Sequence, residues 1–374
     1  MQDETSQFQS LSEVALIPSL DHTVSVMRVL IIKTEPLEEI ILSLPVLDYL
    51  HKVFRGIEVD WLADYSCLEI LSDHPLVSRT LGSSYGRWRS HPFVLKSWRE
   101  AMSLKEIVRE RAYDLVFDLE GTLLSGVVSH LSKCRRRYGL DATFVADQFN
   151  LRFNCNRVPL RRQDQHLTDR ALRMASIPFG RDHADLEPCA EIPVQPDDEI
   201  AAKLFMATLS DGLVFVFHLG TGSATRLWHE TGWIELGREL LSTFAAATIL
   251  LSGNDGSGLA ERVAQGIGRQ TRFLPPMSLS GLAAILRKSD LVVAGDSVPL
   301  HLAAATMTPT VSFYRSTDAR TRAPRGEMHR SIQSPLACSR CQLSSCAKDA
   351  QCRESIKAGD LADAAMAILL NQPQ

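Results

Sequence analysis

The stretch Gly295-Asp296-Ser297-Val298-Pro299-Leu300-His301-Leu302-Ala303-Ala304-Ala305 follows the apolar run 291–294, and together they have the pattern of a strand, a tight turn and a helix. The run is predicted to be a short buried strand, residues 295–297 supply turn and N-cap chemistry, and the alanine-rich segment favours a helix. A helix that begins at the carboxyl end of a parallel strand presents N–H groups and the positive end of its dipole to a ligand. The stretch therefore predicts an anion site; the alternative is an ordinary strand-to-helix junction with a buried core histidine at position 301.

Composition limits the classes of protein to which the chain can belong. Its 374 residues, 45% of them hydrophobic, are more than one core usually holds, so two domains are expected. A formal charge of -4 excludes a strongly basic nucleic-acid binder. The acidic start and the absence of an apolar run near ~20 residues predict a cytoplasmic protein without a signal peptide or membrane span. Scattered cysteines are not typical of a secreted disulfide framework; they are Cys67, Cys134, Cys155 and Cys189.

Short β-branched runs alternate with helical segments in both halves of the chain, which predicts an α/β protein built from βαβ units. The predicted strands are 28–33, 59–63, 113–118, 212–218, 247–251 and 291–294, and predicted helices include 38–47, 228–241, 279–287 and 360–370. Residues 1–27 are polar and are expected to form a flexible lead. A segment rich in Pro, Glu and Asp at 186–196 predicts a boundary between domains 28–190 and 191–374, with a ligand cleft between them.

A loop rich in glycine and hydroxyl groups follows the predicted strand 212–218. Its sequence is Leu219-Gly220-Thr221-Gly222-Ser223-Ala224-Thr225-Arg226. Glycines let a backbone approach a phosphate, Thr221 offers a hydroxyl and Arg226 a neutralising charge. The same composition is typical of a plain turn, so both interpretations stay open.

A basic and aromatic stretch covers Tyr85–Pro92 and Lys96–Glu100, and further basic clusters lie at 134–138 and 157–162. Arginine forks bind phosphate and carboxylate groups and tryptophan planes bind sugar faces, so these segments could form an acceptor surface. Solvated loops and helix faces are the alternative.

Four cysteines lie close together near the C-terminus in the spacing C-x2-C-x4-C-x5-C. They are Cys338, Cys341, Cys346 and Cys352. Four thiolates within one short loop are sufficient for a tetrahedral structural zinc, or for iron, and His329 could replace one of them. Unligated or disulfide-paired cysteines are the alternative.

Motifs in the same order and spacing resemble those of the heptosyltransferases of lipopolysaccharide core assembly, glycosyltransferase family 9. The segment 33–45 is similar to the family's first strand, loop and helix, and 113–121 to its YDLVIDxQG segment. Arg226-Leu227-Trp228 with Trp233 resembles its K-x-W-P-x-x-x-W element, and the stretch quoted first resembles D-[ST]-G-x-x-H-L-A-A-A. The resemblance implies a GT-B fold, two Rossmann-like domains with parallel sheets facing a central cleft, the acceptor on the first and the nucleotide sugar on the second.

The resemblance also implies an inverting glycosyl transfer from ADP-heptose, or a related nucleotide sugar, to an anionic glycolipid acceptor similar to the lipopolysaccharide core. Glu39 matches the family's aspartate base, and no cofactor is implied for catalysis. The donor cradle would comprise Thr221, Arg226, Asp296, Ser297, Val298 and His301. An anionic acceptor implies peripheral contact with the inner face of the inner membrane.

Departures from the family pattern leave two alternatives open. Glu38 stands at the position of a glycine, Glu120 at that of a glutamine and Val298 at that of a second glycine, and Pro299 removes one N–H from the cradle. These changes indicate either a divergent donor or acceptor, or a member that has lost turnover and acts as a nucleotide-sugar-binding scaffold. A protein acceptor, as in a protein O-glycosyltransferase, is a further alternative.

Overall fold

The chain divides into two compact units, residues 1–191 and 192–374. The computed structural model describes residues 26–90, 95–209, 211–253 and 258–370, so most of the predicted flexible lead lies outside the described residues. Each unit is built around a six-stranded sheet whose neighbouring strands are all parallel. The predicted α/β fold with two Rossmann-like parallel sheets is confirmed.

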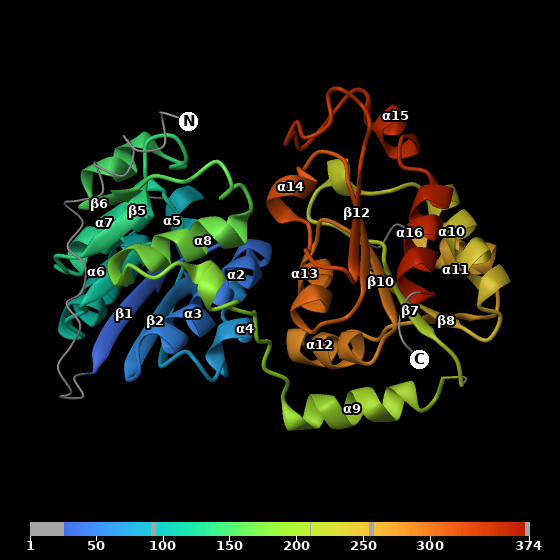
Figure 1. The fold of residues 1–374 in the computed structure, drawn as a ribbon, viewed down its shortest axis with the longest axis horizontal. Coiled ribbons are helices and arrows are strands. Elements are labelled where there is room, and N and C mark those ends of the chain that lie inside the picture. Colours follow the sequence, from blue (N-terminus) through green and yellow to red (C-terminus); the bar gives the residue numbers. More distant parts are fainter. Residues whose placement is uncertain (1–25, 91–94, 210, 254–257, 371–374) are drawn as a thin grey trace. The chain divides into compact units, whose positions relative to one another are not determined.

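The sheet of the first unit has the strand order β3-β2-β1-β4-β5-β6 (Figure 1). This is the order of a dinucleotide-binding fold, in which the direction of winding reverses between the first and fourth strands. The strands are β1 (Met27–Ile32), β2 (Ile57–Asp64), β3 (Arg79–Ser83), β4 (Leu115–Asp118), β5 (Arg137–Leu140) and β6 (Asn156–Val158).

Helices cover both faces of this sheet, as the apolar central strand β1 requires: four of its six residues have no exposed surface. One face carries a core of Trp88, Leu104, Val108 and Val128 from three helices. The helices are α2 (Leu37–Ser43), α3 (Pro45–Val53), α4 (Glu69–Ser72), α5 (Tyr85–Ser90), α6 (Leu95–Glu110), α7 (Leu123–Leu131) and α8 (Leu167–Ser176).

Two sequence predictions in this unit need correction. The single helix predicted over 38–47 is divided at Leu44 into α2 and α3, because Pro45 cannot donate the hydrogen bond that would continue α2. Trp88, in the stretch proposed as an acceptor surface, is a core side chain whose Nε1 donates to Glu100 at 3.2 Å. Residues 91–94 of that stretch lie outside the described residues.

The second unit repeats the topology of the first, with the order β12-β11-β10-β7-β8-β9. Winding therefore reverses between β7 and β10, since β7 is the first strand of this unit and β10 its fourth. The strands are β7 (Val214–His218), β8 (Thr248–Ser252), β9 (Thr271–Phe273), β10 (Leu291–Gly295), β11 (Thr310–Tyr314) and β12 (His329–Gln333).

One face of the second sheet packs on a large apolar core to which α10, α11 and α16 contribute. The rings of Trp228, Trp233 and Phe313 lie within 5.1–5.8 Å of one another in this core. The helices are α9 (Pro196–Met206), α10 (Glu230–Thr243), α11 (Leu259–Ile267), α12 (Leu279–Arg287), α13 (Val298–Ala305), α14 (Ala319–Arg322), α15 (Asp349–Glu354) and α16 (Ala358–Leu369). Over the described part of the chain, none of the helices has the length and apolar character to cross a bilayer.

Candidate functional site

Polar and charged side chains gather at the carboxyl ends of the two central strands of each sheet. In open parallel sheets, ligands bind outside these strand ends at the point where winding reverses. In the second unit the point lies between β7 and β10, and in the first unit between β1 and β4. Each unit therefore has its own candidate site, and the two sites are described separately.

The site of the second unit is built on the turn from β10 to α13 (Figure 1). Asp296, Ser297 and His301 are at most 3% exposed. His301 Nε2 lies 3.1 Å from Asp296 Oδ1, and the Ser297 hydroxyl donates to the carbonyl of Gly295 at 3.0 Å. Val298 is half-buried in the first turn of α13. Pro299 lies in the same turn, where the helix does not need its missing N–H.

Two arginines flank the Asp296 carboxylate. Arg226 Nη1 lies 3.6 Å and Arg322 Nε 4.0 Å from Asp296 Oδ2. Burial alone would raise the pKa of this carboxyl, but the His301 hydrogen bond and the charges of His301, Arg322 and Arg226 hold the pKa below its ordinary value. The site thus combines a fixed carboxylate with two guanidinium groups and the N-terminus of a helix, an arrangement that can bind a diphosphate.

The loop after β7 brings Arg226 to this turn. A Cβ on Gly295 would lie 3.3 Å from the Arg226 carbonyl oxygen, so glycine at position 295 permits the close approach. The Thr221 hydroxyl donates to Ser223 O within the same loop at 2.7 Å, whereas the Arg226 guanidinium lies 3.6 Å from the Asp296 carboxylate. The roles of both residues in donor binding remain predictions.

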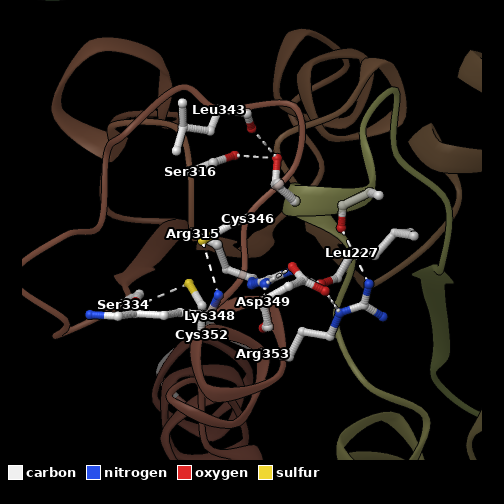
Figure 2. A network of polar contacts seen from close by, with 12 residues as sticks. Leu227, Arg315, Ser316, Ser334, Leu343, Cys346, Lys348, Asp349, Cys352 and Arg353 are labelled. Atoms are coloured by element: carbon white, nitrogen blue, oxygen red, sulfur yellow. Dashed lines mark hydrogen bonds and ion pairs between the residues drawn. The ribbon is translucent and has the colours of Figure 1, made fainter.

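A buried polar network fixes the backbone around Arg226 (Figure 2). The neighbouring Thr225 hydroxyl contacts the carbonyl oxygen of Leu343 at 2.6 Å. The guanidinium of Arg315 donates to the Leu227 carbonyl and pairs with Asp349 at 2.5 Å. The arginine-bearing turn is therefore held from both sides by the segment 315–349.

The four cysteines of the C-terminal loop line one cavity of about 280 Å³ beside this network. All four are free thiols: Cys338 and Cys341 are exposed, and the Sγ of Cys346 accepts a hydrogen bond from Lys348 N at 3.4 Å. Within the part of the chain that the structure describes, no three His, Cys, Asp or Glu side chains are arranged to hold a metal ion. The described side chains therefore do not support the predicted zinc or iron centre, although all four cysteines line the same cavity. His329, the suggested substitute, bonds instead to the Thr310 hydroxyl at 2.9 Å.

The candidate site of the first unit centres on the buried Lys33 ammonium, which follows β1. Its Nζ lies 2.7 Å from Glu39 Oε2 and 3.3 Å from Glu120 Oε2. Burial alone would lower the pKa of Lys33, but the two carboxylates outweigh it and raise the pKa above its ordinary value. The predicted base Glu39, whose side chain is 21% exposed, therefore lies beside an ammonium group whose charged form its two carboxylate neighbours favour.

The sequence analysis did not include Arg322, Lys33 or Glu120 among the candidate site residues. Lys33 and Glu120 could have been predicted as site residues from the sequence, since each is a charged residue within two positions of the end of a buried strand. Arg322 gave no such indication: it lies in the short helix α14 among several other arginines, and the fold alone brings it to Asp296.

Comparisons with known proteins agree with this architecture. The sequence profile of glycosyltransferase family 9 (heptosyltransferase) matches residues 101–351, more than half of the chain. Lipopolysaccharide heptosyltransferase 1 of Pseudomonas aeruginosa is 27% identical over 321 residues, covering 86% of this chain and 87% of that protein. The enzyme of the same name from Escherichia coli K12 is 27% identical over 298 residues, covering 78% and 89%.

Several solved structures are similar to this protein over nearly its whole length. The structure of E. coli heptosyltransferase WaaC with ADP has a TM-score of 0.68 at 25% identity and covers 88% of this chain and 100% of its own. A glycosyl transferase family 9 structure from Veillonella parvula reaches a TM-score of 0.75 at 16% identity, covering 93% and 99%, and shows the fold alone. The two Rossmann-like units are thus those of a GT-B glycosyltransferase.

Within that class, the chain belongs to glycosyltransferase family 9, the heptosyltransferase family. The resemblance that the sequence motifs predicted is confirmed, and so is the assignment of the chain to the glycosyltransferase enzymes.

Proposed function

We propose that this protein transfers a heptose from ADP-heptose, with inversion at the anomeric carbon, to an anionic acceptor similar to the lipopolysaccharide core. The observation that supports it best is the arrangement of Arg226 and Arg322 around Asp296 at the start of α13. The relatives are named lipopolysaccharide heptosyltransferases, and one similar structure contains ADP while another contains ADP-2-deoxy-2-fluoro heptose. The second unit would bind the donor and the first unit the acceptor.

The donor cradle would act on the leaving group. The bond from the anomeric carbon to the diphosphate breaks as the acceptor oxygen bonds to that carbon, so negative charge grows on the phosphate oxygens. Two guanidinium groups and the helix N-terminus stabilise this charge. Asp296 orients Arg226 and His301 and prevents the two arginines from repelling each other.

Glu39 would be the general base. It takes the proton from the acceptor hydroxyl as that oxygen attacks, and it remains in the first turn of α2, where its main-chain oxygen accepts the Ser43 hydroxyl at 2.7 Å. Glutamate performs the same proton transfer as aspartate with one methylene of additional reach. The first unit also exposes cationic side chains, among them Lys133, Arg135 and Arg157, that would attract an anionic glycolipid at the inner face of a cytoplasmic membrane.

Two measurements on one preparation test this proposal. Calorimetric titration with ADP-heptose, ADP, UDP and GDP gives donor affinity, and release of nucleoside diphosphate with a deacylated core acceptor gives turnover. We expect ADP ligands to bind most tightly, and Glu39→Gln to abolish turnover while preserving donor affinity. Binding without release across several acceptors would favour the non-catalytic scaffold, and mass added to a co-expressed protein would favour a protein acceptor.

Membrane contact is tested with vesicles that contain anionic glycolipid. Binding should weaken as ionic strength rises, because exposed cations are screened over about 10 Å at 0.1 M salt. Binding that does not depend on salt would contradict the proposed electrostatic contact.

A further inference from the structure

Glu120 is a buried carboxylate that the proposed reaction does not use directly. It follows β4, whereas Lys33 follows the adjacent strand β1, so their meeting depends on the pairing of these two strands. Its side chain is 9% exposed, and its Oε2 accepts a hydrogen bond from Thr34 N at 3.0 Å in addition to the contact with Lys33. Both contacts fix the carboxylate at one position beside the ammonium.

The position of Lys33 is also fixed. The Lys33 carbonyl accepts the indole N–H of the buried Trp61 at 3.0 Å, and the Lys33 amide donates to Leu62 O at 3.2 Å. These contacts fix the backbone of Lys33, and its buried ammonium is shared by two carboxylates, Glu39 and Glu120.

The effect of the ammonium on the proton affinity of a neighbouring carboxylate depends on how many carboxylates share that ammonium. An ammonium paired with a single carboxylate favours the ionised form of that carboxylate and so weakens it as a proton acceptor. A second carboxylate on the same ammonium offsets this effect, because the cluster then carries one net negative charge and accepts a proton more readily. One cation can thus orient Glu39 without making it a poor base if a second carboxylate, here that of Glu120, shares the same ammonium.

We propose that Glu120 is a positioning residue that acts through Lys33 to keep the Glu39 carboxylate both oriented and basic during glycosyl transfer. The inference rests on the proposed function of Glu39 as the general base. The two neighbours of Glu39 then have opposite effects: the charge of Lys33 favours the ionised form of the Glu39 carboxylate, whereas the charge of Glu120 favours proton uptake by it.

Other charged groups on the surrounding elements have contacts of their own. Asp118 at the end of β4 accepts hydrogen bonds from Asn150 and Asn154, at 2.6 and 2.9 Å. On α8, which packs against α2, Arg170 lies over the Phe144 ring at 5.1 Å. Further charged side chains on or next to these elements include Arg28, Glu35, Glu38, Glu58, Asp60, Asp64, Asp169 and Arg173. Among the described residues, Glu39 and Glu120 form ion pairs with the Lys33 ammonium.

The test is the dependence of kcat/KM on pH, whose acid limb reports the proton affinity of the base in the free enzyme. Glu120→Gln keeps the size of the side chain and an oxygen for Thr34 N but removes the charge. We expect the acid limb of Glu120→Gln to move down by about one pH unit and kcat at neutral pH to fall about tenfold. Lys33→Met should move the limb in the opposite direction, since Glu39 and Glu120 then repel each other. Lys33→Arg, which keeps the charge, should leave the limb near its wild-type position.

Glu106→Gln is the matched control, because Glu106 is exposed on α6. It should leave both the limb and kcat unchanged. If Glu120→Gln lowers activity without moving the limb, or moves it in the same direction as Lys33→Met, the inference is wrong and Glu120 is merely structural. Thermal midpoints of all variants identify loss of folding, and Lys33→Arg keeps the prediction testable if Lys33→Met does not fold. If the wild-type protein releases no ADP from ADP-heptose, the proposed function itself is wrong. If the wild-type protein is active but Glu120→Gln does not move the acid limb as expected, only the inference about Glu120 is wrong.

Discussion

Replacement of Arg315 by methionine should destabilise the second unit and weaken donor binding together. The Arg315 side chain is 1% exposed and donates to the Leu227 carbonyl, the Asp349 carbonyl at 2.9 Å and the Asp349 carboxylate at 2.5 Å. Methionine fills much of the same volume but leaves these three acceptors without the guanidinium. The substitution therefore tests whether the network behind Arg226 holds the donor site in place.

The magnitude follows from the contacts that are lost. Breaking a buried ion pair costs about 3–5 kcal/mol, most of it from the partner left without its counter-charge. Asp349 is 27% exposed and retains Arg353 at 2.7 Å, so the lower end of that range applies, about 3 kcal/mol. For a unit of this size, that loss lowers the midpoint of thermal unfolding by roughly 6–12 °C.

Differential scanning calorimetry measures the midpoint, and calorimetric titration with ADP, well below that midpoint, measures donor affinity. Arg320→Met is the control: Arg320 is 64% exposed and pairs with Asp318 at the surface, so the midpoint should stay close to the wild-type value. A midpoint for Arg315→Met within about 2 °C of wild type would refute the argument that this network stabilises the unit. A normal ADP affinity despite a lower midpoint would mean that the network supports the fold without positioning Arg226.

Three further predictions concern the second unit. Arg226→Gln should weaken ADP binding about tenfold by calorimetry, because a charged hydrogen bond to phosphate is lost, and an unchanged affinity would place the diphosphate elsewhere. Burial lowers the pKa of His329 to about 4. As pH falls, the imidazole of His329 is therefore protonated in the unfolded chain before it is protonated in the folded chain, so stability is lost between about pH 6.5 and 4. His329→Asn should therefore reduce the fall in thermal midpoint over that window, and an identical fall would show that other groups cause it. Cys338 and Cys341 should react rapidly with a thiol reagent in the native protein without releasing zinc; protected thiols and one equivalent of zinc would restore the predicted metal centre.

The central strands and the α13 junction could be predicted from local sequence. Strands β1 and β10 lie in the middle of their sheets and are buried on both faces, so they appear as continuous apolar runs. Strands β9 and β12 were not predicted, because they lie at sheet edges, are partly exposed and have no continuous apolar run. The junction 295–305 was predicted because turn chemistry and helix propensity act within a few residues.

The fold class and its repetition in the two halves of the chain could be predicted from the sequence, because strand and helix patterns are local. Asp296 and His301 lie in the stretch 295–305, whose turn and helix are also predicted locally, and Glu39 was a candidate through the resemblance to family 9. Which charges meet depends on the tertiary structure. Lys33 and Glu120 are 87 positions apart in the sequence and meet because β1 pairs with β4. Arg322 reaches Asp296 from the separate helix α14, and among the described residues the thiols of the short C-terminal loop are not part of a group arranged to hold a metal ion. Spacing along a chain limits how far apart side chains can be, but their directions are set by the packing of elements that are distant in sequence.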